Sequence, residues 1–281
     1  MRRNTQTINR LAAIVLAAVM SIVFARGAWA GETGRKIARE SVIEKIASRG
    51  AMKVGLGIFV PWSFKDKNGK LAGFEVDVAR KLAKDMDVKV EFVPTEWSGI
   101  IPALLTGKFD VIIGGMGITT ERAMKVNFSV PYSWSGMDLV VSQKKLPGVS
   151  SMEDLNRKDV VIAVRMGATP AAAAKKYAPK ARLRQFEDDS AALQEVLNGN
   201  AHAAFSSSPT PAFWAADHPG ALYRPLEGKY LYQDPISFAI RKGDPDAVFF
   251  FNAWITDNQE WLKSRDAYWF GSKDWKHMTA D

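Results

Sequence analysis

The sequence predicts an α/β fold of two lobes with mostly parallel sheets. Short apolar, strand-like runs alternate with amphipathic helical segments from Met52 to Arg122, an order typical of helices packed on a parallel sheet. A second, shorter alternation begins at Val160 and predicts a second lobe of the same kind. The tail from Ala247 is helical and aromatic without a sheet of its own, so we expect it to pack back on the first lobe.

The first series leads to a glycine-rich turn. We expect helices at 42–50, 74–86 and 100–106, strands at 52–56, 88–93 and 111–113, and a polar turn at 66–69. In such sheets ligands bind beyond the carboxyl ends of the strands. Phe59, Trp97 and the stretch from Gly115 to Arg122 follow such ends and are therefore the first candidates for a site.

The second series follows a further strand at 137–142. We expect strands at 160–164, 182–186 and 203–206, helices at 189–197 and 209–216, and an alanine-rich helix opened by Gly167 to Pro170. Asp188 and Asp189 are expected to cap the helix that they begin. These segments repeat the strand–helix order of the first half, which supports the prediction of two lobes.

Residues 1–30 have the features of a secretory signal peptide. Three arginines lie among the first ten residues, residues 11–25 are mostly apolar, and Ala28-Trp29-Ala30 supplies a cleavage site. The apolar run is short for a bilayer span, which disfavours a permanent anchor. No cysteine follows the apolar run to carry a lipid. We therefore expect export to the periplasm as a soluble protein.

Composition excludes several kinds of site. The chain has no cysteine, which excludes a disulfide framework, a thiolate metal site and a thiol nucleophile. The formal net charge of +8 falls to +4 once the four arginines of the signal peptide are removed. Basic residues are interspersed with acids, so neither nucleic acid nor a membrane surface is indicated as a partner.

The stretch Asp110–Tyr132, DVIIGGMGITTERAMKVNFSVPY, carries the strongest chemical signal. A buried strand enters a glycine turn where the backbone can approach a ligand, and Thr119 or Thr120 then caps a short helix. Arg122 would lie in the first helical turn, where a cation opposes the helix dipole, so an anionic partner is indicated. Backbone amides and a forked guanidinium suit a carboxylate. A plain strand–loop–helix joint with a solvated arginine has about equal weight on this stretch alone.

Three segments give the sequence a specific resemblance. GFEVDVARKLA, EWSGIIPALLTGKFDVIIGGMGITTER and VNFSVPYSWSG resemble the family 3 extracellular solute-binding proteins, the periplasmic polar-amino-acid receptors of ABC importers. The likeness runs from about Val42 to Gly271. It implies a type II periplasmic binding protein fold, with a ligand cleft between two lobes and two strand-like crossings near 134–139 and 232–238. Lobe 1 would comprise residues 31–136 and 235–281, and lobe 2 residues 137–234.

The resemblance also implies a ligand site on lobe 1. Arg122 matches the arginine that clamps the ligand carboxylate. Gly115 and Gly117 match positions whose backbone groups face the ligand. Phe59 and Trp97 match aromatic residues that sandwich the ligand side chain.

Lobe 2 contributes the remaining positions that the resemblance implies. Ala168 and Thr169 match a helix N-terminus that donates N–H groups to the same carboxylate. Ser207 falls where the family usually has an aspartate that pairs with the α-ammonium of the ligand. Gly117 replaces a usual hydroxyl residue, and Leu56 stands where receptors for basic amino acids can carry an acid.

These departures shape the ligand hypothesis. Burying an ammonium without an anionic partner is costly, so we expect the amine to pair elsewhere, or the ligand to carry a different cation or none. Phe59 and Trp97, joined by Trp62, Trp134 or Trp214, would form an aromatic cage for such a cation. The hypothesis is a carboxylate-bearing solute other than a plain basic amino acid, with a quaternary or cyclic amino-acid derivative as one option.

Other conspicuous side chains have simpler structural explanations. Trp62 is expected in the lobe core rather than at the ligand, by roughly two to one. Trp134 is expected to pack the hinge. Glu75 and Asp77 are expected to be solvated or capping acids rather than site residues.

An enzyme of the cyclohexadienyl-dehydratase type on the same fold is the alternative function. Such an enzyme needs a proton-donating carboxyl group in the cleft, and the matched positions show no acid–base pair. The three histidines are far apart in sequence, and the serines at 206–208 lack the Gly-x-Ser-x-Gly turn of a hydrolase. A receptor sensor domain and an accessory protein that has lost ligand binding are further alternatives.

We therefore predict a periplasmic solute receptor rather than an enzyme, with no catalytic residues, no metal and no cofactor. It would capture an amino acid or related carboxylate by lobe closure and deliver it to an ABC permease in the inner membrane. We expect a monomer that binds no nucleic acid.

Overall fold

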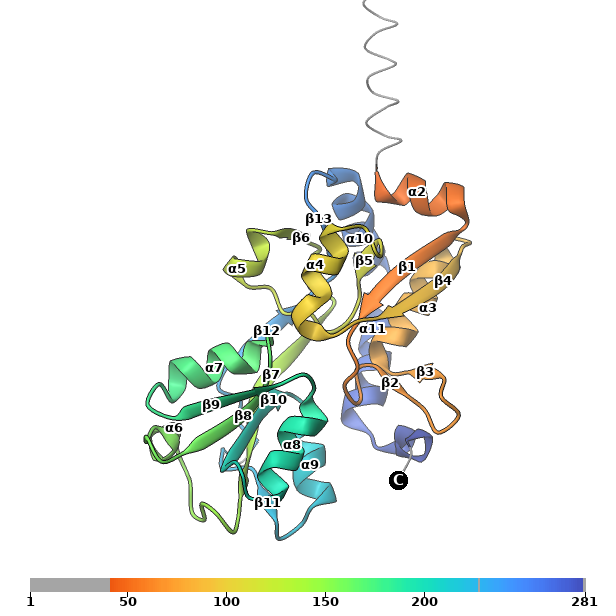
Figure 1. The fold of residues 1–281 in the computed structure, drawn as a ribbon. Helices are drawn as coiled ribbons and strands as arrows, with labels where there is room; N and C mark the ends of the chain where they lie inside the picture. The colour runs from red at the N-terminus through yellow and green to blue at the C-terminus, as the bar shows by residue number, and fades with distance from the viewer. Residues whose placement is uncertain (1–40, 227, 280–281) are drawn as a thin grey trace, which may run out of the picture.

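The computed structural model describes residues 41–226 and 228–279, which form two lobes, each built around its own sheet (Figure 1). The predicted signal peptide, residues 1–30, lies outside the described residues. Within the described ranges, no helix has both the length and the apolar character of a membrane span.

The first lobe contains a five-stranded sheet. Its strands, in spatial order, are β4 (Lys89–Pro94), β1 (Ala51–Leu56), β5 (Val111–Ile112), β13 (Ala239–Arg241) and β6 (Val126–Phe128). A small hairpin of β2 (Phe64–Lys65) and β3 (Leu71–Ala72) adjoins it. The helices of this lobe are α2 (Val42–Arg49), α3 (Phe74–Asp85), α4 (Ile100–Leu105), α5 (Thr120–Ala123), α10 (Pro245–Asp257) and α11 (Gln259–Asp266). A 3₁₀ turn, Trp97–Gly99, precedes α4.

The second lobe contains a six-stranded sheet. Its path runs through β11 (Leu222–Tyr223), β7 (Ser133–Ser142), β10 (Ala203–Ser207), β8 (Val161–Arg165) and β9 (Arg182–Phe186), with β12 (Gln233–Ile236) also paired to β7. Its helices are α6 (Met152–Leu155), α7 (Thr169–Tyr177), α8 (Asp189–Leu197) and α9 (Thr210–Asp217). The two lobes therefore repeat one architecture, as the alternation in sequence predicts.

The sheets are parallel where the sequence alternates and antiparallel where the chain passes between lobes. β1 pairs in parallel with β4 and β5, and β8 pairs in parallel with β9 and β10. β12 instead runs antiparallel to β7, with Ile236 opposite Ser133. β7 leads into the second lobe and β12 leads back, so the two crossing strands must run in opposite directions.

Local capping explains several helix boundaries. The Thr119 side chain accepts a hydrogen bond from the N–H of Arg122 at 3.2 Å, and the Asp188 side chain accepts one from Ala191 at 2.7 Å. Both contacts satisfy an N–H group that has no partner within its helix. Gly50 ends α2 in the left-handed conformation, at φ 68°.

The C-terminal segment packs on the first lobe, which confirms the expectation from its aromatic sequence. Trp269 donates its indole N–H to Asp77 at 2.8 Å, and Arg265 pairs with the same carboxylate at 2.5 Å. Asp77 is therefore an anchor for the tail rather than the solvated or capping acid expected from the sequence. Trp275 continues to the second lobe, where its ring meets Phe213 of α9 edge-on, with centroids 5.2 Å apart.

Other tryptophans divide between the core and the surface. Trp62 is 1% exposed in the first-lobe core and stacks on Phe59 at 5.7 Å, as its core assignment predicts. Trp134 is 59% exposed, so the expectation that it packs the hinge is wrong. Its position on β7 turns it outward, because neighbouring residues of a strand face opposite sides.

Candidate functional site

The candidate site lies between the lobes, where the carboxyl ends of the parallel strands face each other. Phe59 follows β1, Trp97 follows β4, and the glycine turn follows β5. From the second lobe, Arg165 ends β8 and the turn at Gly167 leads into α7. Parallel sheets bring these ends to one edge, so both lobes present their loops to the same cleft.

Arg122 connects the two lobes across this cleft. Its guanidinium donates from Nη1 to the carbonyl oxygen of Gly117 at 2.8 Å and from Nη2 to the carbonyl oxygen of Gly167 at 3.0 Å. Arg122 is only 9% exposed, which disagrees with the alternative of a solvated arginine at a plain strand–loop–helix joint. Burial lowers the pKa of Arg122, and the nearby Asp234 carboxyl acts in the opposite direction.

Gly115 shapes the turn that precedes Arg122. It has φ 70°, a conformation that favours glycine, and an added Cβ would lie 2.9 Å from the ring of Phe59. A larger residue would push the turn and the aromatic ring apart. The sequence analysis expects the glycine turn to approach a ligand; in the structure the neighbour that requires glycine at position 115 is the Phe59 ring.

Glu75 is buried against the glycine turn and is hydrogen-bonded by the backbone of Gly115. This corrects the expectation that it is a solvated or capping acid. It is fully buried at the start of α3 and accepts a hydrogen bond from the Tyr132 hydroxyl at 2.6 Å. Burial raises the pKa of Glu75 to about 8, although hydrogen bonds from Tyr132 and the backbone of Gly115 oppose the shift. The side chain is therefore a neutral carboxylic acid at pH 7.

Asp234 is a candidate site residue that the sequence did not identify. It lies on the returning strand β12, where an added Cβ on Gly117 would be 3.3 Å from its Cβ and 3.4 Å from its Oδ2. Burial raises the pKa of Asp234, while a hydrogen bond from the Thr169 side chain and the charge of Arg122 lower it. The only sequence signal was indirect: glycine at position 117 leaves space for a neighbour.

Arg165 and Asp189 form a second buried pair that sequence reasoning missed. Arg165 Nη1 lies 3.2 Å from Asp189 Oδ2, and the two side chains are 6% and 7% exposed. The Arg165 guanidinium carbon lies 4.4 Å from the ring centroid of Phe59 and 4.7 Å from that of Trp97. The cage predicted from these aromatics thus holds a side chain of the protein itself.

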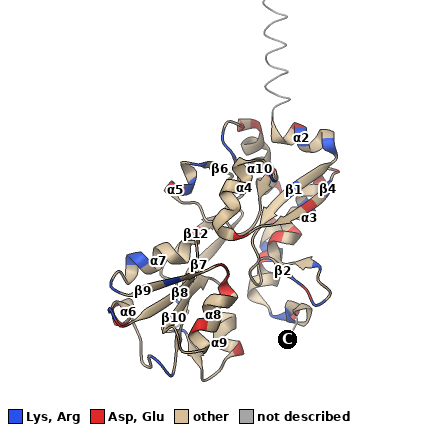
Figure 2. Cartoon of the chain, in the orientation of Figure 1, with Lys and Arg blue, Asp and Glu red and all other residues tan. Residues whose placement is uncertain are grey.

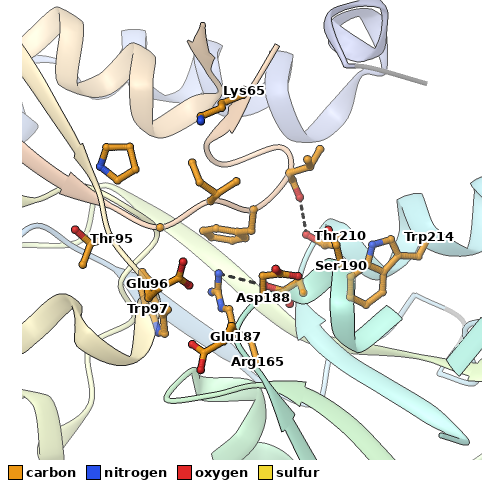
Figure 3. A pocket seen from close by; sticks show the side chains of 16 residues that line it. Lys65, Thr95, Glu96, Trp97, Arg165, Glu187, Asp188, Ser190, Thr210 and Trp214 are labelled. Atoms are coloured by element: carbon orange, nitrogen blue, oxygen red, sulfur yellow. Dashed lines mark hydrogen bonds and ion pairs between the residues drawn. The ribbon is translucent and has the colours of Figure 1, made fainter. Parts of the chain in front are cut away.

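Trp97 lines two cavities. One, of about 420 Å³, is bordered by Arg165, Glu187 and Thr210. Figure 3 shows Arg165, Trp97 and Thr210 among the side chains that line it. The other, of about 640 Å³, is bordered by Arg122 and Ala168.

The remaining predicted site residues lie on the second lobe. Ala168 is 6% exposed and precedes Thr169, the first residue of α7, so both stand at a helix N-terminus beside Arg122. Ser207 lies at the end of β10, opposite Met137 in the ladder with β7. The neighbouring Ser206 donates its hydroxyl to Asp189 Oδ1 at 2.6 Å.

Comparisons with known proteins agree with this architecture. Residues 52–272 match the bacterial extracellular solute-binding proteins, family 3, and the chain belongs to that family. It is 29% identical over 246 residues to the L-cystine-binding protein TcyJ of Escherichia coli (strain K12), covering 86% of this chain and 91% of that protein.

Two solved structures extend the comparison. The ancestral amino acid-binding protein AncCDT-1, described as a precursor of cyclohexadienyl dehydratase, is 43% identical with a TM-score of 0.75, covering 82% of this chain and 99% of that one. A putative ABC-transporter binding component of Wolinella succinogenes DSM 1740, solved with lysine, is 36% identical with a TM-score of 0.75, covering 81% and 99%. The two-lobed α/β fold is therefore that of a solute-binding protein.

Proposed function

We propose that this protein is a periplasmic receptor that captures an amino acid or related carboxylate between its lobes and delivers it to an ABC permease of the inner membrane. The observation that carries the proposal is Arg122, a buried guanidinium of the first lobe that reaches the second lobe at Gly167. Family membership supports the same role. Basic and acidic residues are interspersed over both lobes (Figure 2), as expected for a receptor of small solutes.

The proposed mechanism is closure of the lobes on a carboxylate. Arg122 offers charge-assisted hydrogen bonds from one side, and the N-terminus of α7 at Thr169 offers backbone N–H groups from the other. A ligand that contacts both lobes favours the closed arrangement. The proposed lobe boundaries are 31–136 with 235–281 and 137–234, and the paired strands β7 and β12 act as the hinge.

Asp234 is the proposed partner of a ligand ammonium. Position 207 carries serine, so it cannot supply the carboxylate that the family usually offers to the ligand ammonium. Asp234 can supply one instead, because it lies against Gly117, where a side chain would otherwise stand. The carboxyl lies near both Arg122 and the Thr169 side chain, so a cation bound beside it would face a carboxyl group at the cleft. Glycine at 117 and aspartate at 234 would thus compensate for the serine at 207.

A dehydratase on the same fold is the second candidate, and Asp234 is the observation that favours it. A carboxyl group with a raised pKa beside a carboxylate clamp is a suitable proton donor. Incubation of the purified protein with prephenate or arogenate tests this function: product formation that disappears in Asp234→Asn would support the enzyme. A receptor leaves both compounds unchanged.

A ligand screen tests the receptor directly. The protein is unfolded and refolded to remove carried-over solute, then screened by thermal shift against amino acids, betaines and small organic acids. A ligand of the folded state raises the melting temperature, by mass action, and calorimetric titration then gives its affinity. We expect stabilisation by at least one carboxylate-bearing solute. Failure of every carboxylate, or binding that survives esterification of the carboxylate, would contradict the proposal.

A further inference from the structure

Arg165 occupies the part of the cleft where two aromatic rings from the other lobe converge. Phe59 and Trp97 have centroids 6.5 Å apart and an interplanar angle of 65°, and the Arg165 guanidinium packs against both. A desolvated cation over aromatic faces is attracted by the negative potential of the rings. The space beside the two aromatic rings is therefore already occupied by a cation of the protein itself, the Arg165 guanidinium.

The hydrogen-bonding capacity of this guanidinium is largely unused. Among the described residues, Arg165 Nε and Nη1 have no hydrogen-bond acceptor, although the side chain is only 6% exposed. Asp189 neutralises the charge, but its alignment with Nη1 gives an ion pair rather than a hydrogen bond. Buried donors without acceptors are destabilising, so an acceptor supplied by the ligand would be stabilising.

Arg122 and Arg165 both pack near the ring of Trp97. Their guanidinium carbons lie 5.7 Å and 4.7 Å from its ring centroid, and each arginine lines one of the two cavities that Trp97 also lines. A solute held by Arg122 and lying along Trp97 would therefore meet the Arg165 guanidinium at its distal end. The carboxylates of Glu96, Glu187 and Asp188 also border the Arg165 cavity, but they are exposed and screened by solvent.

We propose that Arg165 determines specificity in this cleft: it excludes ammonium and guanidinium side chains from the aromatic pair and selects a solute whose distal end carries a carboxylate or carboxamide oxygen. The inference rests on the proposed receptor function, in which Arg122 holds the near carboxylate. Asp189 acts as a positioning residue, held by the Ser206 hydroxyl so that Arg165 stays between the rings.

A matched ligand series tests the inference by calorimetry. Glutamate and glutamine carry the distal oxygen, norvaline has a similar carbon chain without it, and lysine and arginine carry a distal cation. We expect glutamate or glutamine to bind at least about tenfold more tightly than norvaline, since one or two charge-assisted hydrogen bonds distinguish them. Lysine and arginine should bind at least about tenfold more weakly than glutamate or glutamine.

Variants separate specificity from general damage. Arg165→Met keeps an unbranched apolar side chain without the guanidinium donors, so it should remove the preference for a distal oxygen while leaving norvaline affinity unchanged or higher. Asp189→Asn keeps Arg165 and removes its counter-charge, which should increase the ratio of glutamate to glutamine affinity. Arg184→Met is the control, because Arg184 on the neighbouring strand β9 pairs with Glu195 and is 48% exposed.

Each outcome has a defined meaning. Tight binding of lysine or arginine to the unaltered protein overturns the inference but leaves the receptor function intact. A tight ligand of any class whose affinity is the same in Arg165→Met also overturns it. If neither the unaltered protein nor Arg165→Met binds any compound of this series or of the wider carboxylate screen, both proposals are contradicted. If Arg165→Met does not fold, the response of Asp189→Asn decides, and an unchanged glutamate-to-glutamine ratio rejects the role of Arg165.

Discussion

Gly117 and Asp234 share one small volume at the cleft. A Cβ on Gly117 would lie 3.3 Å from the Cβ of Asp234, a distance tighter than most contacts between side chains. The absence of a side chain on one strand end therefore allows a carboxyl group on the returning strand. This relationship gives a structural reason for one departure from the usual family pattern, glycine at 117.

Asp234→Asn should weaken ligands that carry an α-ammonium. Removing one member of a buried charge pair costs about 2–5 kcal/mol, which corresponds to a loss of about thirtyfold or more in affinity. Calorimetry with an amino acid and its 2-hydroxy analogue measures the effect. The amino acid should lose affinity and the hydroxy acid should not.

Ser207→Asp provides the matched rescue. If position 207 is the alternative place for the carboxylate, adding this change to Asp234→Asn should recover part of the lost affinity. An equal loss for both ligands in Asp234→Asn would show that the residue supports the cleft without contacting the amine.

Arg122→Ala should reduce binding of every carboxylate ligand by about 2–5 kcal/mol, because a charge-assisted clamp in a buried setting is lost. Calorimetric titration measures the affinity, and far-UV circular dichroism checks the fold. Arg122→Lys should also bind weakly, since a lysine ammonium cannot present the planar fork that reaches Gly117 and Gly167 together. Unchanged affinity in either folded variant would reject the clamp.

Thr210→Val should favour the open arrangement of the lobes. The Thr210 hydroxyl, on the second lobe, donates to the carbonyl oxygen of Val60 on the first lobe at 2.9 Å. One such hydrogen bond contributes about 0.5–1.5 kcal/mol, so ligand affinity should fall by about twofold to tenfold. Small-angle scattering of the unliganded protein should show a larger radius of gyration. Thr210→Ser keeps the hydroxyl and should behave as the unaltered protein; equal effects of both changes would exclude the hydrogen bond as the cause.

Glu75 should make stability fall as pH rises. Its pKa is raised from 4.5 to about 8 in the folded protein, so the folded state binds more protons than the unfolded state between these values. The stabilisation is complete below about pH 4.5 and is lost as pH rises toward about 8. Glu75→Gln should remove this dependence, because glutamine keeps a neutral acceptor for the Tyr132 hydroxyl.

Denaturant melts of both proteins at pH 5 and pH 8.5 measure this difference. The unaltered protein should lose more stability than Glu75→Gln over that interval. Parallel pH dependence in the two proteins would exclude Glu75 as the titrating group.

Sequence reasoning succeeded where the determinants are local. Thr119 and Asp188 cap the helices that their positions predict, and α8 has the predicted bounds of 189–197. Hydrophobic alternation was sufficient to predict two sheets. These features depend on residues within a few positions of each other, so a single sequence contains the relevant information.

The pairings across the cleft could not be predicted in the same way. Asp234 meets Gly117 only because β12 returns beside the glycine turn, and Arg165 meets Phe59 only when the lobes face each other. Neither Arg165 nor Asp189 belongs to a motif, and Asp189 was interpreted as a helix-capping residue. The ligand-binding roles of Phe59, Trp97 and Arg122 stay predictions until a solute is measured.

The edge-on contact of Trp275 with Phe213 gives the molecule an optical reporter. Trp275 is 1% exposed, its surroundings belong to the first lobe, and Phe213 belongs to the second. Separation of the halves would hydrate this indole and shift its emission to longer wavelength, whereas capture of a solute would reverse the shift. Subtraction of the spectrum of Trp275→Phe would isolate that signal, so the opening rate can be followed by stopped flow without attaching a dye.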